Sequence, residues 1–200
     1  MTTELTPIKV AVIEFRIIGL SPLIQNAWDE KALEMLRMTA MERKKRKKEP
    51  RDPEASAAAK AHRTAEGKYG IPLLAFKASL IGAAHKNFGI EKTMVRKAFF
   101  IADPDGTGII PMECREPIVR EDVVRVGMGA TDLRYRPEFR EWAVDITADI
   151  DAEILNEGDV VNLVNRAGFG VGIGEWRPEK GGDFGRYKID PDADITVTDK

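Results

Sequence analysis

Residues 167–186 read Ala-Gly-Phe-Gly-Val-Gly-Ile-Gly-Glu-Trp-Arg-Pro-Glu-Lys-Gly-Gly-Asp-Phe-Gly-Arg, and seven of these residues are glycine. Each glycine loses extra backbone entropy on folding, so such a cluster indicates positive φ angles or a close approach of the backbone to another group. A predicted helix over 156–167 precedes the segment, and a predicted strand over 184–189 follows it. We expect the segment to connect the last helix to a closing strand.

The segment does not have the pattern of a nucleotide-binding loop. It lacks the Gly-x-x-x-x-Gly-Lys-Ser/Thr spacing, and its Gly-x-Gly-x-Gly-x-Gly rhythm differs from Gly-x-Gly-x-x-Gly. It also follows a helix and precedes a strand, which is the reverse of the order in dinucleotide-binding folds.

Two interpretations of the segment therefore remain. One is structural: a helix C-cap at Gly168 followed by an irregular edge strand. The other is a nucleic-acid surface, because aromatic side chains stack on bases and cations bind phosphates. The residues that would form this surface are Trp176, Arg177, Lys180, Phe184 and Arg186.

Outward from this segment, the hydrophobic pattern predicts an α+β fold. Strands are predicted over residues 8–19, 95–102, 121–128, 142–150 and 184–189, and helices over residues 28–41, 73–88 and 156–167. Without residues 42–68, this order approximates a β-α-β-β-α-β layout. We predict a modified ferredoxin-like, RNA-recognition-motif-like (RRM-like) antiparallel sheet with helices packed against it.

The domain organisation follows from changes in composition. Residues 1–189 are expected to form a single RRM-like domain, and residues 190–200 a loose acidic tail. An exposed, partly helical insertion is predicted over about 42–68, where large apolar residues are few. Its basic run Arg43–Lys48 fits either a solvated helix end or an arm that contacts phosphates.

A protruding β-hairpin is predicted over about 121–150, with a long basic tip over 129–140. A loop of this length in a compact domain is usually functional or mobile. Arginine binds phosphate bidentately and tyrosine stacks on bases, which makes a nucleic-acid contact one interpretation. A solvated tip and a self-association arm are the others. The hairpin residues that would bind nucleic acid are Arg125, Arg134, Tyr135 and Arg136.

Composition limits the possible functions. The net charge of the 200 residues is −2, so any nucleic-acid site must be a local patch. One cysteine excludes an internal disulfide framework and fits a reducing cytoplasm. The polar N-terminus and the lack of a long apolar run predict a cytoplasmic protein with no membrane contact.

No catalytic or metal-binding constellation is found in the sequence. His62 and His85 have no Gly-x-Ser-x-Gly partner, and two histidines with one cysteine make a structural zinc site a poor interpretation. Residues 103–114 partly match a calcium-binding loop, but Cys114 stands where that loop needs a bidentate Glu. We therefore expect a protein that is not an enzyme and that needs no cofactor or metal.

Three segments together resemble the repeat-associated RNA-binding (RAMP) superfamily, which includes the Cas7-type backbone subunits of CRISPR effector complexes. They are residues 15–23 (Phe-Arg-Ile-Ile-Gly-Leu-Ser-Pro-Leu), residues 70–80 (Gly-Ile-Pro-Leu-Leu-Ala-Phe-Lys-Ala-Ser-Leu) and the glycine-rich segment. In this chain Ile81 stands before the glycine that follows Ser-Leu in the superfamily. The whole chain also resembles a family of small proteins encoded by tailed phages.

These resemblances imply an RRM-like fold with a thumb hairpin and head-to-tail assembly along a single strand. The thumb would be Arg125–Arg140, and Lys77 would contact the strand from the helix entry at Ile71–Lys77. The expected function is single-stranded nucleic-acid binding, with DNA favoured, in phage replication or recombination. Alternatives are an interaction, structural or inhibitor protein on the same fold, and a Cas7-like RNA-binding subunit.

Overall fold

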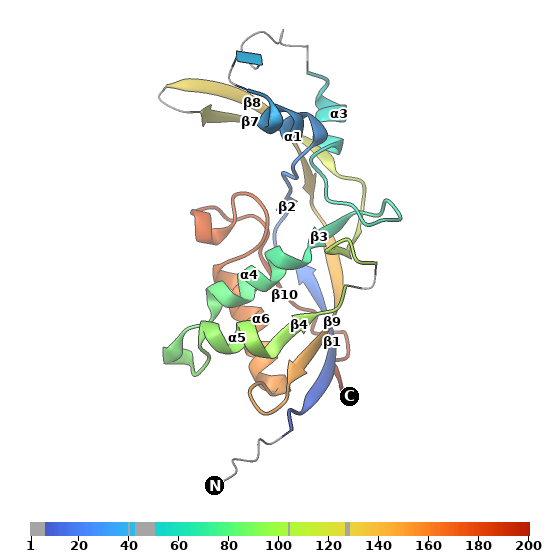
Figure 1. Cartoon of the computed structure of the whole chain (residues 1–200), viewed down its shortest axis with the longest axis vertical. Coiled ribbons are helices and arrows are strands. Elements are labelled where there is room, and N and C mark those ends of the chain that lie inside the picture. Colours follow the sequence, from blue (N-terminus) through green and yellow to red (C-terminus); the bar gives the residue numbers. More distant parts are fainter. Residues whose placement is uncertain (1–6, 40, 43–50, 104, 127–128) are drawn as a thin grey trace.

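The computed structural model describes residues 7–39, 41–42, 51–103, 105–126 and 129–200. The molecule is elongated, with a sheet-and-helix core at the end that carries both termini and a long β-hairpin at the opposite end (Figure 1). A short strand and several loops connect the two parts.

The core is the predicted ferredoxin-like arrangement. Its antiparallel sheet has the order β10-β1-β9-β4, with β1 at Val10–Gly19, β4 at Phe99–Ile101, β9 at Trp142–Asp151 and β10 at Tyr187–Ile189. Helices α4 (Leu73–Ala83) and α5 (Lys92–Ala98) connect β1 to β4, and α6 (Glu157–Gly170) connects β9 to β10. This is the β-α-β-β-α-β connectivity of that fold, so the predicted fold class is confirmed.

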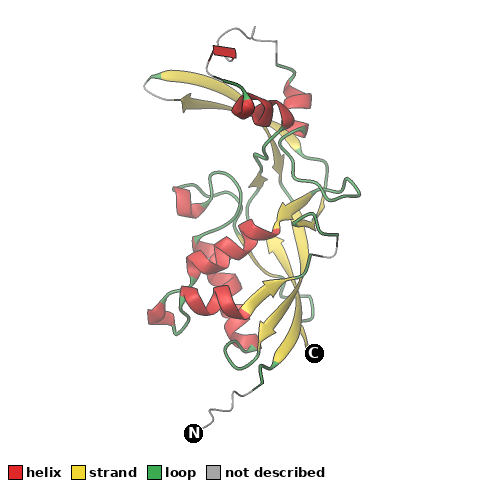
Figure 2. Ribbon diagram, viewed as in Figure 1, coloured by secondary structure: helices red, strands yellow, loops and turns green. Residues whose placement is uncertain are grey.

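Alternation along β1 explains how the core forms. Ile13, Phe15 and Ile17 are buried, and residues two apart in a strand share one face of the sheet. The three core helices lie on this side of the sheet (Figure 2), where α6 contributes Val160, Leu163 and Val164. Burying each such side chain contributes about 1.5–3 kcal/mol relative to leaving it exposed.

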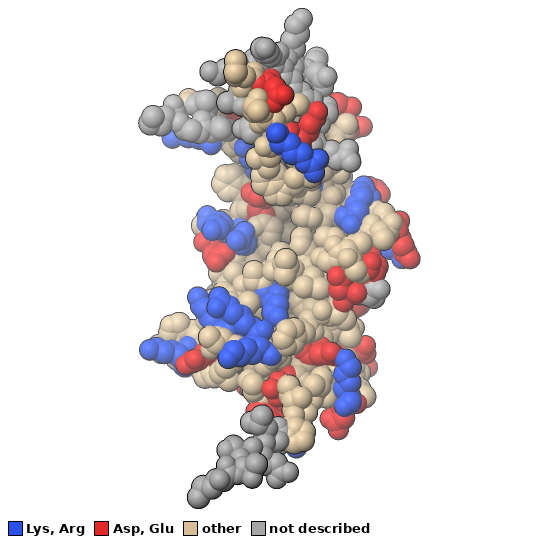
Figure 3. Space-filling view, viewed as in Figure 1, with Lys and Arg blue, Asp and Glu red and all other residues tan. Residues whose placement is uncertain are grey.

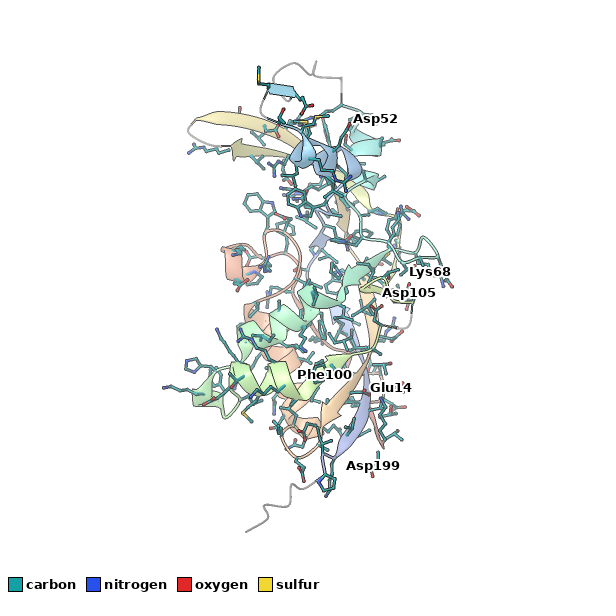
Figure 4. All side chains as sticks on the ribbon, viewed as in Figure 1. Glu14, Asp52, Lys68, Phe100, Asp105 and Asp199 are labelled. Carbon is teal, nitrogen blue, oxygen red and sulfur yellow. The ribbon has the colours of Figure 1, made fainter. Side chains whose placement is uncertain are left out.

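The opposite face of the core sheet is charged and open. Arg16 on β1 lies across from Asp145 on β9, and its guanidinium also pairs with Glu113 and Asp190. Glu14 projects from the same strand toward solvent (Figure 4). Because carboxylates outnumber the cation in this cluster, the open sheet face offers little to a polyanion.

The prediction of a loose acidic tail is wrong over its last residues. Thr196–Asp199 form β11, which pairs antiparallel with Ala11–Glu14 of β1. Strand β10 covers only the other end of β1, at Ile17–Gly19, so β11 satisfies backbone groups that would otherwise form a free edge.

The hairpin is formed by a different pair of strands from the pair predicted. Strand β7 (Ile118–Val126) pairs with β8 (Ala130–Phe139), and β2 (Leu23–Ile24) pairs with the other edge of β8. Residues predicted as a basic tip therefore form a strand, and β9 belongs to the core sheet rather than to the hairpin. Charged residues alternate along this strand with Leu133, Tyr135 and Phe139, and ion pairs between the strands accommodate the charges.

The described part of the insertion is not a free arm. Helix α1 (Glu30–Arg37) precedes it, and helix α3 (Pro53–Ala58), with Asp52 as N-cap (Figure 4), packs against the hairpin and buries Ala57. Arg51 forms an ion pair with Asp132 of β8. The basic run 43–48 lies outside the described residues.

Short elements complete the fold. Strand β3 (Gly70–Pro72) pairs with β5 (Ile109–Pro111), β6 (Glu113–Cys114) pairs with β9, and the 3-10 helices are η1 (Lys86–Phe88) and η2 (Pro178–Lys180). The predicted strand over 95–102 is wrong in its first half, because α5 continues to Ala98. The predicted helix over 73–88 ends five residues early, at Ala83.

Candidate nucleic-acid interface

A cleft of about 190 Å³ lies beside β2, and none of its lining residues belongs to the hairpin strands β7 and β8. Its walls come from the chain around β2, the insertion, the start of α4 and the glycine-rich segment. The lining residues are Leu23, Gln25, Asn26, His62, Ile71, Pro72, Ala75, Ile173, Gly174, Glu175 and Arg177. The glycine-rich segment thus contributes to a concave surface together with residues far from it in the sequence.

The glycines of this segment let the chain fold closely on itself. The N–H of Gly185 donates to the Pro22 carbonyl, and the N–H of Glu175 donates to the Ile24 carbonyl. A Cβ at Gly185 would lie less than 3.0 Å from the Ile173 carbonyl oxygen, and its φ of 63° is in the left-handed region. The close approach predicted from the sequence is therefore to the protein's own backbone.

Trp176 is the unusual residue of the segment. It adopts a φ of 55° although it is not glycine, and its side chain is 45% exposed. A bulky residue in this region is strained by about 1–3 kcal/mol and persists only when its surroundings fix it. Here the Trp176 carbonyl accepts the N–H of Phe184, which fixes the backbone while the indole stays accessible. Trp176 itself does not line the cleft, but its chain neighbours Glu175 and Arg177 do.

Arg136, predicted to bind nucleic acid, is instead a buried structural residue. Only 3% of it is exposed, and its guanidinium donates to Asp122 at 3.0 Å and lies 3.8 Å from Glu175. Arg120, directly opposite in the hairpin, pairs with Asp122 and with Glu138. This network joins both hairpin strands to the glycine-rich segment, so Arg136 is unavailable to phosphate.

The other predicted hairpin residues lie away from the cleft lining. Arg125 is exposed near the end of β7, and Arg134 is 3.7 Å from Asp132. Tyr135 is opposite Glu121 in the register and is half-buried. These residues are therefore not brought together around the cleft.

The predicted cations of the glycine-rich segment have varied environments. Arg177 donates to the Gly174 carbonyl at 3.0 Å and to Glu179 at 2.8 Å, and Lys180 is exposed in η2. The guanidinium of Arg186 lies 5.2 Å from the ring centre of Phe169. Phe184 receives the Arg120 guanidinium over its ring at 4.8 Å, so one face of this ring is already covered.

Lys77 does not line the cleft. It lies on α4 with its ammonium 4.2 Å from the Phe100 ring centre and 3.4 Å from the Arg96 carbonyl oxygen. Burial lowers the pKa of Lys77 below its ordinary value. Its surroundings belong to a separate surface formed by the core helices.

Several cleft residues were missed from the sequence because their types are common in loops. Gln25, which is buried, donates to the Gly70 carbonyl and accepts the N–H of His62, each at 2.8 Å. Asn26 donates to Glu175 at 3.3 Å. These amides tie three distant segments together, and only their position directly after the Ser-Pro-Leu turn hinted at such a role.

His62 should give the fold a measurable pH dependence. Burial lowers the pKa of His62 below its ordinary 6.5. The unfolded chain then binds this proton more readily than the folded chain, so the free energy of unfolding falls as pH drops below about 6.5 and levels off below the folded pKa. We expect His62→Gln to reduce the difference between denaturant midpoints measured at pH 7.5 and pH 5.5.

The control for this prediction is His85→Gln, since His85 is exposed on the core and lies outside the cleft. The pH dependence that is lost in His62→Gln and retained in His85→Gln is then the part due to His62. Equal pH dependence in wild type and His62→Gln would contradict the assignment.

Two comparisons with known proteins were negative. No protein-family model matches the chain, and a search of curated proteins finds no match. Among the described residues, no helix has both the length and the apolar character needed to cross a membrane. Across the same residues, no cluster of three or more His, Cys, Asp or Glu side chains is arranged to hold a metal ion.

Proposed function

We propose that the protein binds single-stranded nucleic acid, with DNA favoured over RNA, at the cleft beside β2 and the glycine-rich segment. The observation that carries the proposal is Trp176, an exposed indole held in a strained backbone conformation between two residues, Glu175 and Arg177, that line the cleft. Strain of this kind concentrates at functional sites. A free indole face is also the surface on which an unpaired base stacks, contributing about 1–3 kcal/mol.

Cations beside Trp176 would hold the phosphates. Lys180 is exposed four residues further along the chain. Arg177 pairs with Glu179, but the side chains are 30% and 46% exposed, and such surface pairs contribute only about 0–1 kcal/mol. Phosphate can therefore replace Glu179 as the partner of Arg177.

The size of the cleft favours binding along its rim. About 190 Å³ is less than the roughly 300–1,000 Å³ typical of sites that enclose a small molecule. We therefore propose a non-enzymatic role in which the strand passes over the cleft and successive subunits assemble head-to-tail along it. The resemblance to tailed-phage proteins favours a role in phage replication or recombination, in the host cytoplasm, and the RAMP resemblance keeps RNA as the alternative ligand.

Substitution of Trp176 tests the proposal. Trp176→Ala should weaken binding of a fluorescein-labelled single-stranded oligonucleotide about tenfold, as measured by anisotropy at low salt with DNA and RNA arms. Trp176→Phe should retain most of the affinity because it keeps a stacking ring. Trp176→Gly should bind as weakly as Trp176→Ala.

The glycine and alanine variants separate binding from folding. Glycine accepts the φ of 55° without strain, so Trp176→Gly should be more stable than Trp176→Ala by about 1 kcal/mol in denaturant titrations. Undetectable wild-type affinity for both oligonucleotides, or full affinity in Trp176→Ala, would overturn the proposal.

An interaction or structural protein is the second candidate, and exposed apolar residues support it. Val123 on the hairpin and Leu36 on α1 are both largely exposed. Size-exclusion chromatography with light scattering, with and without oligonucleotide, distinguishes the two functions. An oligomer that ignores oligonucleotide favours this second function, whereas assembly that depends on oligonucleotide favours the first.

A further inference from the structure

Positive charge is concentrated in one part of the core. Residues 73–98 contain five lysine or arginine residues (Lys77, Lys86, Lys92, Arg96 and Lys97) and one acid, Glu91, although the net charge of the whole chain is −2. This stretch forms α4, η1 and α5, and none of its five cations lines the cleft proposed to bind single strands.

The fold gathers these cations with Arg166 of α6. The Lys77 ammonium lies 3.4 Å from the Arg96 carbonyl oxygen, which brings α4 and α5 together. The Arg166 guanidinium lies 4.0 Å from the ring centre of Phe88 in η1. Figure 3 shows lysine and arginine side chains grouped over the region of α4 and α5. We call this surface, defined by these six cations, the basic helical face.

Most cations of the basic helical face have no acidic partner. Within the part of the chain that the structure describes, no ion pair joins Lys86, Lys92, Arg96 or Lys97 to a carboxylate. The acid within the stretch, Glu91, instead caps the first turn of α5 and accepts the Thr93 hydroxyl.

Asp159 of α6 is likewise held in the capping box of its own helix, where its carboxylate accepts the N–H of Asn156. The contrast with the hairpin is clear, since Arg136 there is buried against Asp122. The basic helical face therefore keeps charge that an outside anion can use.

The aromatic residues of this face each already hold a cation over the ring. Phe88 has the Arg166 guanidinium over its ring, and Phe100 (Figure 4) has the Lys77 ammonium over its ring at 4.2 Å. Each ring stabilises a cation on the surface through its π electrons. The two rings therefore add to the positive charge of the face by holding Lys77 and Arg166 on it.

We propose that the basic helical face binds the phosphate backbone of double-stranded nucleic acid. A duplex presents closely spaced phosphates on a rigid exterior and offers no unpaired base, which matches a surface of unpaired cations whose two rings already hold cations. Lys92 and Arg96 are four residues apart in α5 and so lie on the same side of that helix. This site is independent of the cleft and of Trp176.

The test measures binding of a fluorescein-labelled 20-base-pair DNA duplex to the full chain by anisotropy across a salt series. The variant K92Q/R96Q/K97Q should bind duplex at least tenfold more weakly than wild type. The slope of log affinity against log salt should fall by about 2–3, because each phosphate contact contributes about 0.9. The control K9Q/K68Q/K188Q removes the same three charges elsewhere and should stay within about twofold of wild type.

Further arms make the result decisive. Trp176→Ala should keep its affinity for duplex while losing affinity for single strands. The single-strand proposal and the duplex proposal can therefore fail independently. K92R/K97R should bind duplex like wild type, which shows that charge and not fold was lost in the glutamine variant. Equal weakening by both glutamine triples overturns the proposal. The proposal is also overturned if wild type binds no duplex but binds vesicles of anionic lipid, and K92Q/R96Q/K97Q weakens that vesicle binding.

Discussion

Replacing Arg136 with alanine should lower the free energy of unfolding by about 2–3 kcal/mol, because it removes one of the two guanidinium groups that neutralise the buried Asp122 carboxylate and leaves only Arg120. Arg136 is 3% exposed and Asp122 is 9% exposed, and their atoms are 3.0 Å apart. Water cannot solvate the Asp122 carboxylate well once the guanidinium is gone. Equilibrium denaturation followed by tryptophan fluorescence and circular dichroism measures the loss.

Arg134→Ala is the matched control on the same strand. Its side chain is 41% exposed and lies 3.7 Å from Asp132, so its removal should change the free energy of unfolding by less than about 1 kcal/mol. The double variant Arg136→Met with Asp122→Leu removes both charges and should be less destabilised than Arg136→Ala. A loss below 1 kcal/mol in Arg136→Ala would show that the network is solvated.

The same network explains why the sequence was misleading about the hairpin. Arginines beside a tyrosine have the composition of a nucleic-acid surface, and that composition alone does not show which cations are neutralised. Pairing in register places Arg120 opposite Arg136, with Asp122 and Glu138 beside them. The partners Asp122 and Glu138 are far apart in the chain, so only the register of the two strands reveals the network.

The core was more predictable because its signals are local. Alternation along residues 8–19 identified β1, and the helical spacing over 156–167 identified α6, which extends to Gly170. The pairing of Thr196–Asp199 with β1 was missed because acidic residues surround this short strand. It forms because β1 has a free edge there, which is a property of the assembled sheet.

The candidate sites show the same division between local and non-local information. Trp176 and its neighbouring cations were identified from composition, whereas the cleft needs Gln25 and His62 from distant segments. The basic helical face could have been predicted from the sequence, because residues 73–98 contain five cations and only one acid. It was overlooked because each cation, taken singly, fits an ordinary solvated helix surface.

The contact between α6 and β10 depends on Gly168. A Cβ on Gly168 would lie less than 3.0 Å from the carbonyl oxygen of Tyr187, and backbone cannot move aside as a flexible side chain can. Tyr187 is completely buried, and its hydroxyl lies 2.8 Å from the Ser79 hydroxyl on α4, so the strand is held from both sides. Gly168→Ala should therefore lower the free energy of unfolding by about 3 kcal/mol, the upper part of the usual range for overpacking.

Gly170→Ala is the matched control for Gly168→Ala, two residues further along the same helix. No atom lies within 4 Å of a Cβ at Gly170, so alanine there should stabilise the helix by up to about 1 kcal/mol. Opposite effects in denaturant titrations would show that Gly168 is needed for close packing of α6 on β10. Equal effects would contradict this requirement. They would mean that the contact of Gly168 with β10 does not fix the start of the glycine-rich segment.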